Sequence, residues 1–106
     1  MAFIKVIIER FVDPSQPGFV ECSLTDARNK MHLFQDKIPV FTTLDLDENS
    51  PYPQEGVLDC EVLKYWMDTE GRSIITITTE RPWYVDSTEG LYEFDLLKEQ
   101  VIIPLQ

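Results

Sequence analysis

The stretch from Gly56 to Trp83 constrains the fold more than any other part of the chain. Val57–Met67 and Arg72–Thr79 are rich in β-branched and aromatic residues, which pack well on a pleated sheet and lose rotamer freedom in a helix. The segment Asp68–Gly71 between them ends in a glycine, which allows the positive φ angle that a chain reversal needs. The sequence therefore predicts a long β-hairpin that stops before Pro82, because proline cannot donate a hydrogen bond to a neighbouring strand.

Shorter strands are predicted on both sides of this hairpin. In Phe19–Thr25, apolar and polar residues alternate, which indicates a strand with one buried face. Pro39 places Val40–Leu44 at a sheet edge, and Asp45–Glu55, with two prolines and no basic residue, is predicted to be a surface loop. The strands expected besides the hairpin are Ala2–Phe11, Phe19–Thr25, Lys30–Gln35, Val40–Leu44, Trp83–Val85, Leu91–Leu97 and Val101–Pro104.

These elements predict an all-β fold with little or no helix beyond a bend or single helical turn at Leu97–Gln100. Short strands with a turn about every 8–12 residues are typical of an antiparallel β-sandwich or a small barrel. We expect about seven to nine short strands, and the pattern does not distinguish the sandwich from the barrel. A chain of 106 residues is expected to form a single domain spanning residues 1–106.

The two cysteines, Cys22 and Cys60, each lie among apolar residues in a predicted strand. We expect two buried free thiols, since neither cysteine has the spacing of a metal or redox motif. No apolar run approaches the roughly 20 residues of a membrane span, and the early charge of Lys5 argues against a signal peptide. The expected location is therefore cytoplasmic.

The formal net charge is −10, and it is unevenly distributed. Acidic and basic residues balance over residues 1–40, so the whole net charge lies in residues 41–106. No basic residue occurs between Lys37 and Lys64. A chain of this kind should repel nucleic acid and anionic membranes and attract basic partners.

The sequence contains no motif that indicates catalysis, a cofactor or a metal site. Asp45, Asp47 and Asn49 match the start of a calcium loop, but Gly56 occupies the position where the loop needs a bidentate glutamate. These aspartates are instead expected to cap their own turns. His32 is the only histidine, and no nucleophile signature accompanies it, so we expect a packing or surface role rather than a catalytic one.

The charge pattern favours a non-enzymatic binding protein that docks on a basic protein partner. In size, in acidity and in its lack of catalytic residues, the chain resembles the immunity proteins that neutralise nuclease toxins. The resemblance implies an inhibitor of a toxin, with acidic contacts and aromatic anchors. The predicted partner-binding residues are Asp45, Asp47, Glu48, Glu55, Asp59 and Glu61, with Tyr52 and Trp66 as anchors.

The alternative is a module that binds a carbohydrate or another small ligand on exposed aromatic rings. It requires Trp66, Trp83 or Tyr84 to line a groove beside polar groups. The sequence places Tyr52 in a loop and so favours exposure of its ring, whereas Trp83 is expected in the core.

Overall fold

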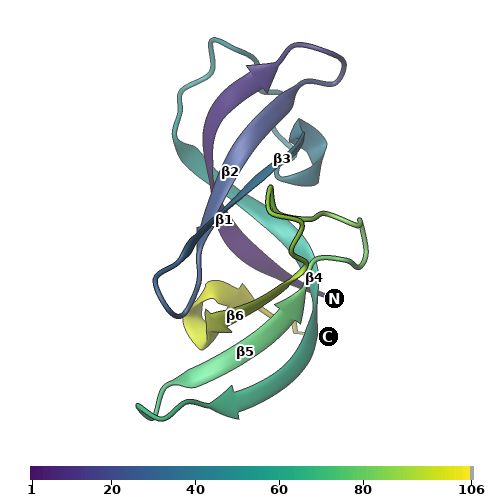
Figure 1. The fold of residues 1–106 in the computed structure, drawn as a ribbon. Coiled ribbons are helices and arrows are strands. Elements are labelled where there is room, and N and C mark those ends of the chain that lie inside the picture. Colours follow the sequence, from purple (N-terminus) through teal and green to yellow (C-terminus); the bar gives the residue numbers. More distant parts are fainter. Residues whose placement is uncertain (106) are drawn as a thin grey trace.

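A computed structural model describes residues 1–105 and shows one antiparallel sheet that curls into a half-barrel (Figure 1). Within these residues there are seven strands, and the only helices are two single 3₁₀ turns. The strands are β1 (Ala2–Asp13), β2 (Phe19–Thr25), β3 (Met31–Lys37), β4 (Gln54–Met67), β5 (Ser73–Thr78), β6 (Glu93–Leu97) and β7 (Val101–Ile102). The 3₁₀ turns are η1 (Ile38–Val40) and η2 (Lys98–Gln100). Neither is long and apolar enough to cross a membrane.

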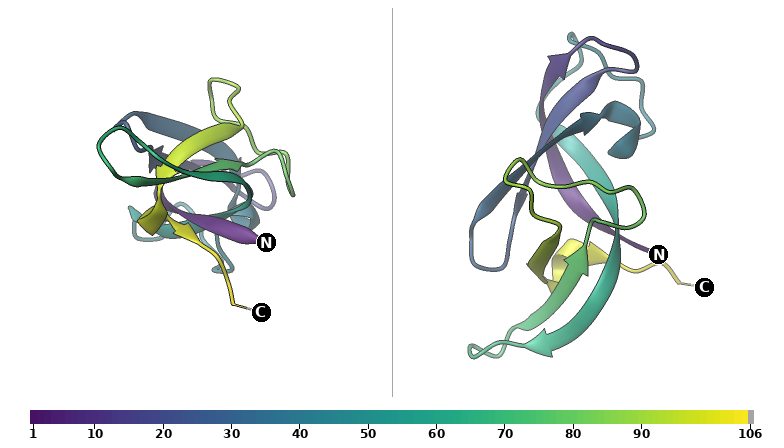
Figure 2. Two further views of the ribbon diagram at one scale, coloured as in Figure 1. Left: turned by 90° about the horizontal axis from the view of Figure 1, so that it is seen from below. Right: turned by 45° about the vertical axis from the view of Figure 1, so that its right-hand side comes forward.

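The two longest strands, β1 and β4, hold the sheet together because each pairs with different neighbours along its length. The sheet order is β3-β2-β1-β4-β5-β6, and β7 also pairs with β1. The first half of β4 pairs with β1 from Ile8 opposite Gln54 to Ala2 opposite Cys60. Its second half pairs with β5, starting at Glu61 opposite Thr78. β4 therefore runs from the part of the sheet that contains β1 into the part that contains β5 (Figures 1 and 2).

The curl is completed by the C-terminal segment. η2 follows β6 and leads into β7, where Ile102 lies opposite Phe3 of β1. The side-chain amide of Gln100 accepts a hydrogen bond from the backbone N–H of Leu97 and donates one to the carbonyl oxygen of Thr25. This glutamine therefore ties η2 both to β6 and to the end of β2.

The core lies on the concave face of the sheet. Alternate residues of β1 and β4 point into it, and Ile4, Ile8, Leu58 and Cys60 are fully buried. The expected hairpin is confirmed, as are the first two strands, the strand before residue 38, and the single helical turn near Leu97. The all-β antiparallel class is confirmed too, and the curled half-barrel is closer to the barrel alternative than to the sandwich.

Two predicted strands are absent. Val40–Leu44 forms the end of η1 and a turn, because Pro39 begins a 3₁₀ turn in which the N–H of Phe41 bonds to the carbonyl of Ile38. Trp83–Val85 also lies in a turn, where the N–H of Tyr84 bonds to the carbonyl of Glu80. Both segments have strand-forming side chains, but the N–H groups of Phe41 and Tyr84 bond within their own turns, so neither segment becomes a strand.

Both cysteines are fully buried and free, as expected. Burial raises the pKa of Cys22 and the pKa of Cys60 to about 12, and nearby carboxylates add to the shift. Both thiols therefore stay protonated and poorly nucleophilic at neutral pH.

Phe41 is fully buried, although it lies outside the regular strands, and it packs the segment after η1 against the core. We expect Phe41→Ala to lower the free energy of unfolding by about 3–5 kcal/mol, since it removes a buried ring and leaves a cavity. Leu44→Ala, at an exposed side chain three residues later, should change it by less than about 0.5 kcal/mol. Urea denaturation of both variants measures these values, and equal effects at the two positions would contradict the assignment of Phe41 to the core.

Candidate functional site

Acidic side chains line the outer face of the first half of β4. Gly56, Leu58 and Cys60 point into the core, so the alternate residues point outward. Glu55 and Glu61 are exposed, and Asp59 between them is partly exposed. Three of the six carboxylates predicted to contact a partner thus share one face of a single strand.

A groove of about 380 Å³ runs between this part of β4 and the segment that follows η1. Glu55, Val57 and Asp59 form one wall, and the segment Pro39–Thr43 forms the other. The N–H of Val57 donates to the carbonyl oxygen of Phe41 at 2.9 Å, which fixes the two walls against each other. The lining combines two carboxylates and two threonines with apolar residues such as Pro39, Val40 and Val57.

Gly56 sets how closely the two walls approach. A Cβ atom at this position would lie 2.8 Å from two side-chain carbons of Ile8 and 3.1 Å from the carbonyl oxygen of Phe41. Such distances are too short for non-bonded carbon atoms. The absence of a side chain at Gly56 therefore allows the segment after η1 to lie against β4.

The segment from Glu80 to Tyr84, here called the aromatic loop, presents two large rings to solvent. Trp83 is 59% exposed and Tyr84 is 71% exposed, so the prediction that Trp83 belongs to the core is wrong. Nε1 of Trp83 donates to Oδ2 of Asp59 at 3.0 Å, which holds the indole beside the acidic face of β4. The ring of Tyr84 meets that of Tyr92 edge to face, with centroids 6.5 Å apart.

Tyr84 has a φ angle of 56°, a left-handed conformation that is uncommon for a bulky residue. Hydrogen bonds on both sides maintain it: the N–H of Tyr84 bonds to Glu80, and the N–H of Val85 bonds to Thr79. Strained backbone that directs large apolar side chains into solvent is found at binding sites more often than elsewhere.

Most of the six carboxylates predicted to contact a partner form no ion pair within residues 1–105. Glu61 forms an ion pair with Arg81 at 2.9 Å. Within residues 1–105, the other five predicted carboxylates make no ion pair; they are Asp45, Asp47, Glu48, Glu55 and Asp59. Their negative charge is therefore available to an external partner.

Asp45, Asp47 and Glu48 lie in the loop between η1 and β4, and all three are exposed. Asp45 lines a second hollow of about 380 Å³, which shares Thr42 and Thr43 with the groove. Asp47 accepts the backbone N–H of Asn49 at 2.8 Å, so the expectation that this aspartate caps its own turn is confirmed. This loop therefore extends the acidic surface from the groove.

The two predicted anchors lie elsewhere. Tyr52 is partly buried against the core, and its hydroxyl donates to the carbonyl oxygen of Asp47 at 2.7 Å, so the prediction of an exposed ring is wrong. Burial raises the pKa of Tyr52. Trp66 lies seven residues beyond Asp59 on β4, roughly 20 Å along an extended strand, and is not brought to the groove.

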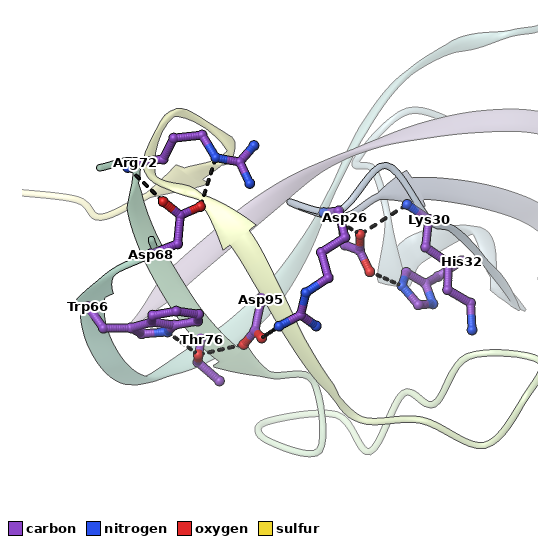
Figure 3. A network of polar contacts seen from close by, with 9 residues as sticks. Asp26, Lys30, His32, Trp66, Asp68, Arg72, Thr76 and Asp95 are labelled. Carbon is purple, nitrogen blue, oxygen red and sulfur yellow. Dashed lines mark hydrogen bonds and ion pairs between the residues drawn. The ribbon is translucent and has the colours of Figure 1, made fainter. Parts of the chain in front are cut away.

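Trp66 belongs instead to a polar network on the β4–β5 hairpin (Figure 3). Its Nε1 donates to the hydroxyl of Thr76 at 2.9 Å, and that hydroxyl donates to Asp95 at 2.6 Å. The ammonium of Lys64 lies 5.6 Å from the centre of the indole ring, within range of a cation–π contact. These contacts hold the indole against the outer face of the sheet.

A second polar group surrounds His32, which is buried and packs edge to face on Phe94. Nε2 of His32 forms a 2.8 Å hydrogen bond with Asp26 (Figure 3). Asp26 also accepts the backbone N–H groups of Arg28 and Lys30 and so organises the β2–β3 turn. The packing role predicted for His32 agrees with this arrangement.

A hollow of about 230 Å³ adjoins this pair, and its lining contains no serine or cysteine that His32 could activate. Within residues 1–105, no group of three or more histidine, cysteine, aspartate or glutamate side chains is arranged to hold a metal ion. Searches against protein-family models, curated proteins and solved structures find no match for this chain.

The Asp26 carboxylate gives stability a defined pH dependence. Partial burial pushes the pKa of Asp26 upward, but hydrogen bonds from His32, Lys30 and Arg28 outweigh burial and hold it below its usual value. The carboxylate therefore stabilises the fold fully above its unfolded-state pKa of about 3.9. That contribution is lost as the pH falls through the lower, folded-state value.

We expect Asp26→Asn to lower the free energy of unfolding by about 1–2 kcal/mol at pH 7. The loss should shrink as the pH falls below the unfolded-state pKa of about 3.9 and through the lower folded-state value, since the wild-type carboxyl then becomes neutral as well. Urea denaturation at several pH values measures this loss of unfolding free energy. Asp86→Asn, at an exposed aspartate, is the control and should have little effect at any pH; a loss for Asp26→Asn that does not change with pH would contradict the assigned role.

Proposed function

We propose that this protein binds a basic protein through the acidic groove and the aromatic loop. The observation that supports it best is that Glu55 and Asp59 line a groove and form no ion pair within residues 1–105, while the exposed Trp83 bonds to Asp59. Asp45 continues the same acidic surface across the shared threonines. A lysine or arginine of the partner would meet two carboxylates, two hydroxyl groups and apolar side chains there.

The two kinds of side chain would act at different stages of binding. Exposed carboxylates attract a basic surface over a distance and accelerate association, most strongly at low salt. Large aromatic rings that become buried in the complex slow dissociation. In this proposal Trp83 and Tyr84 replace Tyr52 and Trp66 as the anchors, because both rings are exposed and Trp83 bonds to Asp59 in the wall of the groove.

The partner proposed in particular is a toxin such as a nuclease, whose surface is basic because it binds nucleic acid. An acidic protein that covers such a surface blocks access of the substrate without doing chemistry itself. The proposal is therefore an immunity-type inhibitor that is not an enzyme and binds neither nucleic acid nor membranes. A cytoplasmic location belongs to the same proposal.

Charge reversal on the groove tests this function. The variant Asp45→Lys/Glu55→Lys/Asp59→Lys should associate with the partner about 10–100-fold more slowly at low salt, with a smaller change at high salt. The matched control, Asp86→Lys/Glu93→Lys/Glu99→Lys, changes the net charge equally at exposed positions outside the groove that, within residues 1–105, form no ion pair. The partner is first captured from a cell lysate, identified by mass spectrometry and purified, and the rates are then measured by surface plasmon resonance.

Two outcomes would overturn the proposal. One is the absence of any stoichiometric basic partner at low salt. The other is an equal effect of the two triple variants, because the net charge alone, and not the groove, would then govern binding. Circular dichroism shows whether each variant keeps the fold.

A second candidate function is supported by the exposure of Trp83, whose indole bonds to Asp59 in the wall of the groove. An exposed aromatic ring next to hydroxyl and carboxylate groups suits a carbohydrate or another small ligand. A groove of this size would hold only a small ligand or the end of a larger one.

The chain contains only two tryptophans, which makes fluorescence a specific test of this second function. In Trp66→Phe, Trp83 is the only tryptophan, and a bound sugar should shift its emission to the blue in a manner largely independent of salt. Trp83→Phe is the control and should show no shift. A panel of mono- and oligosaccharides that leaves Trp83 emission unchanged at millimolar concentration would contradict sugar binding.

A further inference from the structure

The second half of β4 has a free edge. Pairing with β1 ends at Cys60, opposite Ala2, and from Glu61 onward β4 pairs with β5 alone. Within residues 1–105, the edge of Glu61–Met67 that faces away from β5 forms no hydrogen bond with backbone or side chains. In two views of the ribbon, this part of β4 borders the lower hairpin with no strand beyond it (Figures 1 and 2).

Apolar side chains are exposed along this edge strand. Leu63 is 41% exposed, Tyr65 is 65% exposed and Met67 is 66% exposed. Proteins usually protect free edges with proline, with several charges or with a covering segment, because an open edge accepts another strand. A bulge near Leu63 and the charges of Glu61 and Lys64 are the only such features in this segment.

The charge of this segment differs from that of the groove. Glu61–Met67 contains one acid and one base and is therefore neutral. The acid, Glu61, already forms an ion pair with Arg81, and the base, Lys64, lies over the Trp66 ring. A basic partner would find no free carboxylate here, so electrostatics do not favour the proposed toxin as the occupant.

The strand is complementary to a second copy of itself. In a two-fold antiparallel pair, residue i of one copy lies opposite residue j of the other, and every contact occurs twice. A pair centred on Tyr65 places Leu63 opposite Met67 and Lys64 opposite Trp66. No like charges then oppose each other, whereas a pair centred on Lys64 would place two ammonium groups together.

We propose that two copies of this chain pair edge to edge through Glu61–Met67 of β4, antiparallel and centred on Tyr65. The pairing satisfies the free backbone groups, covers the three apolar side chains and joins the two sheets into one. It leaves the acidic groove of each copy accessible, because Glu55 and Asp59 precede the paired segment. The proposal is independent of the function proposed for the groove.

Sedimentation velocity over a range of protein concentrations tests the pairing. Wild-type protein should form a dimer, and Tyr65→Lys should weaken it by more than about tenfold, since two ammonium groups would face each other at the centre. Tyr84→Lys changes a similarly exposed tyrosine on the aromatic loop and should leave the dimer intact. Charge reversal at the groove should also leave it intact, so failure of this inference is distinguishable from failure of the proposed function.

Disulfide trapping tests the register. Residues directly opposite each other in an antiparallel pair have Cα atoms about 4.5–5.5 Å apart, within the range of a disulfide. Tyr65→Cys should therefore form a covalent dimer under mild oxidation, whereas Tyr84→Cys should not. Cys22 and Cys60 do not interfere, because both are buried. Wild-type protein that stays monomeric at all concentrations, or trapping that is equal at positions 65 and 84, would overturn the proposal.

Discussion

The backbone hydrogen bonds between β1 and β4 connect all other parts of the sheet. Seven opposed residue pairs join these strands, from Ile8–Gln54 to Ala2–Cys60. β2 and β7 attach to the far edge of β1, and β5 and β6 attach through the rest of β4. The apolar residues that alternate along both strands form the centre of the core. Without this ladder, the β2–β3 and β5–β6 parts would have no common framework, because each pairs with only one of the two long strands.

Much of this framework could be predicted from local sequence patterns. The β4–β5 hairpin combines strand-forming residues with a turn that ends in Gly71, and β2 alternates apolar and polar residues from Val20 to Thr25. The patterns were misleading where side chains suited a strand but the backbone formed a turn. Phe41 and Val85 are buried in turns, and their neighbours bond within the turn. Strand propensity reports how well a side chain fits a sheet, not whether a partner strand is present.

The candidate site could be predicted only in part, because the exposure of its aromatic rings depends on how the loops fold. The carboxylates of Glu55, Asp59 and Glu61 follow from the alternation of β4, which a sequence displays directly. The exposure of Tyr52 and Trp83 depends on where their loops fold back, and both were predicted wrongly. The hydroxyl of Tyr52 has a backbone partner in its own loop, and the indole of Trp83 is held by an aspartate on a distant strand. Neither contact leaves a signal in the local sequence.

Gly56 has a consequence for how the groove can vary. Its missing side chain determines the distance between the two walls, since any Cβ atom would meet Ile8 and the Phe41 carbonyl. Other lining residues, such as Thr42, Thr43 and Glu55, do not limit the distance between the two walls in this way. The depth of the groove and its chemical character are therefore controlled by different positions. Substitutions at these other lining residues can alter what the groove prefers to bind while its shape is preserved. One scaffold could therefore adapt to partners of different surface chemistry.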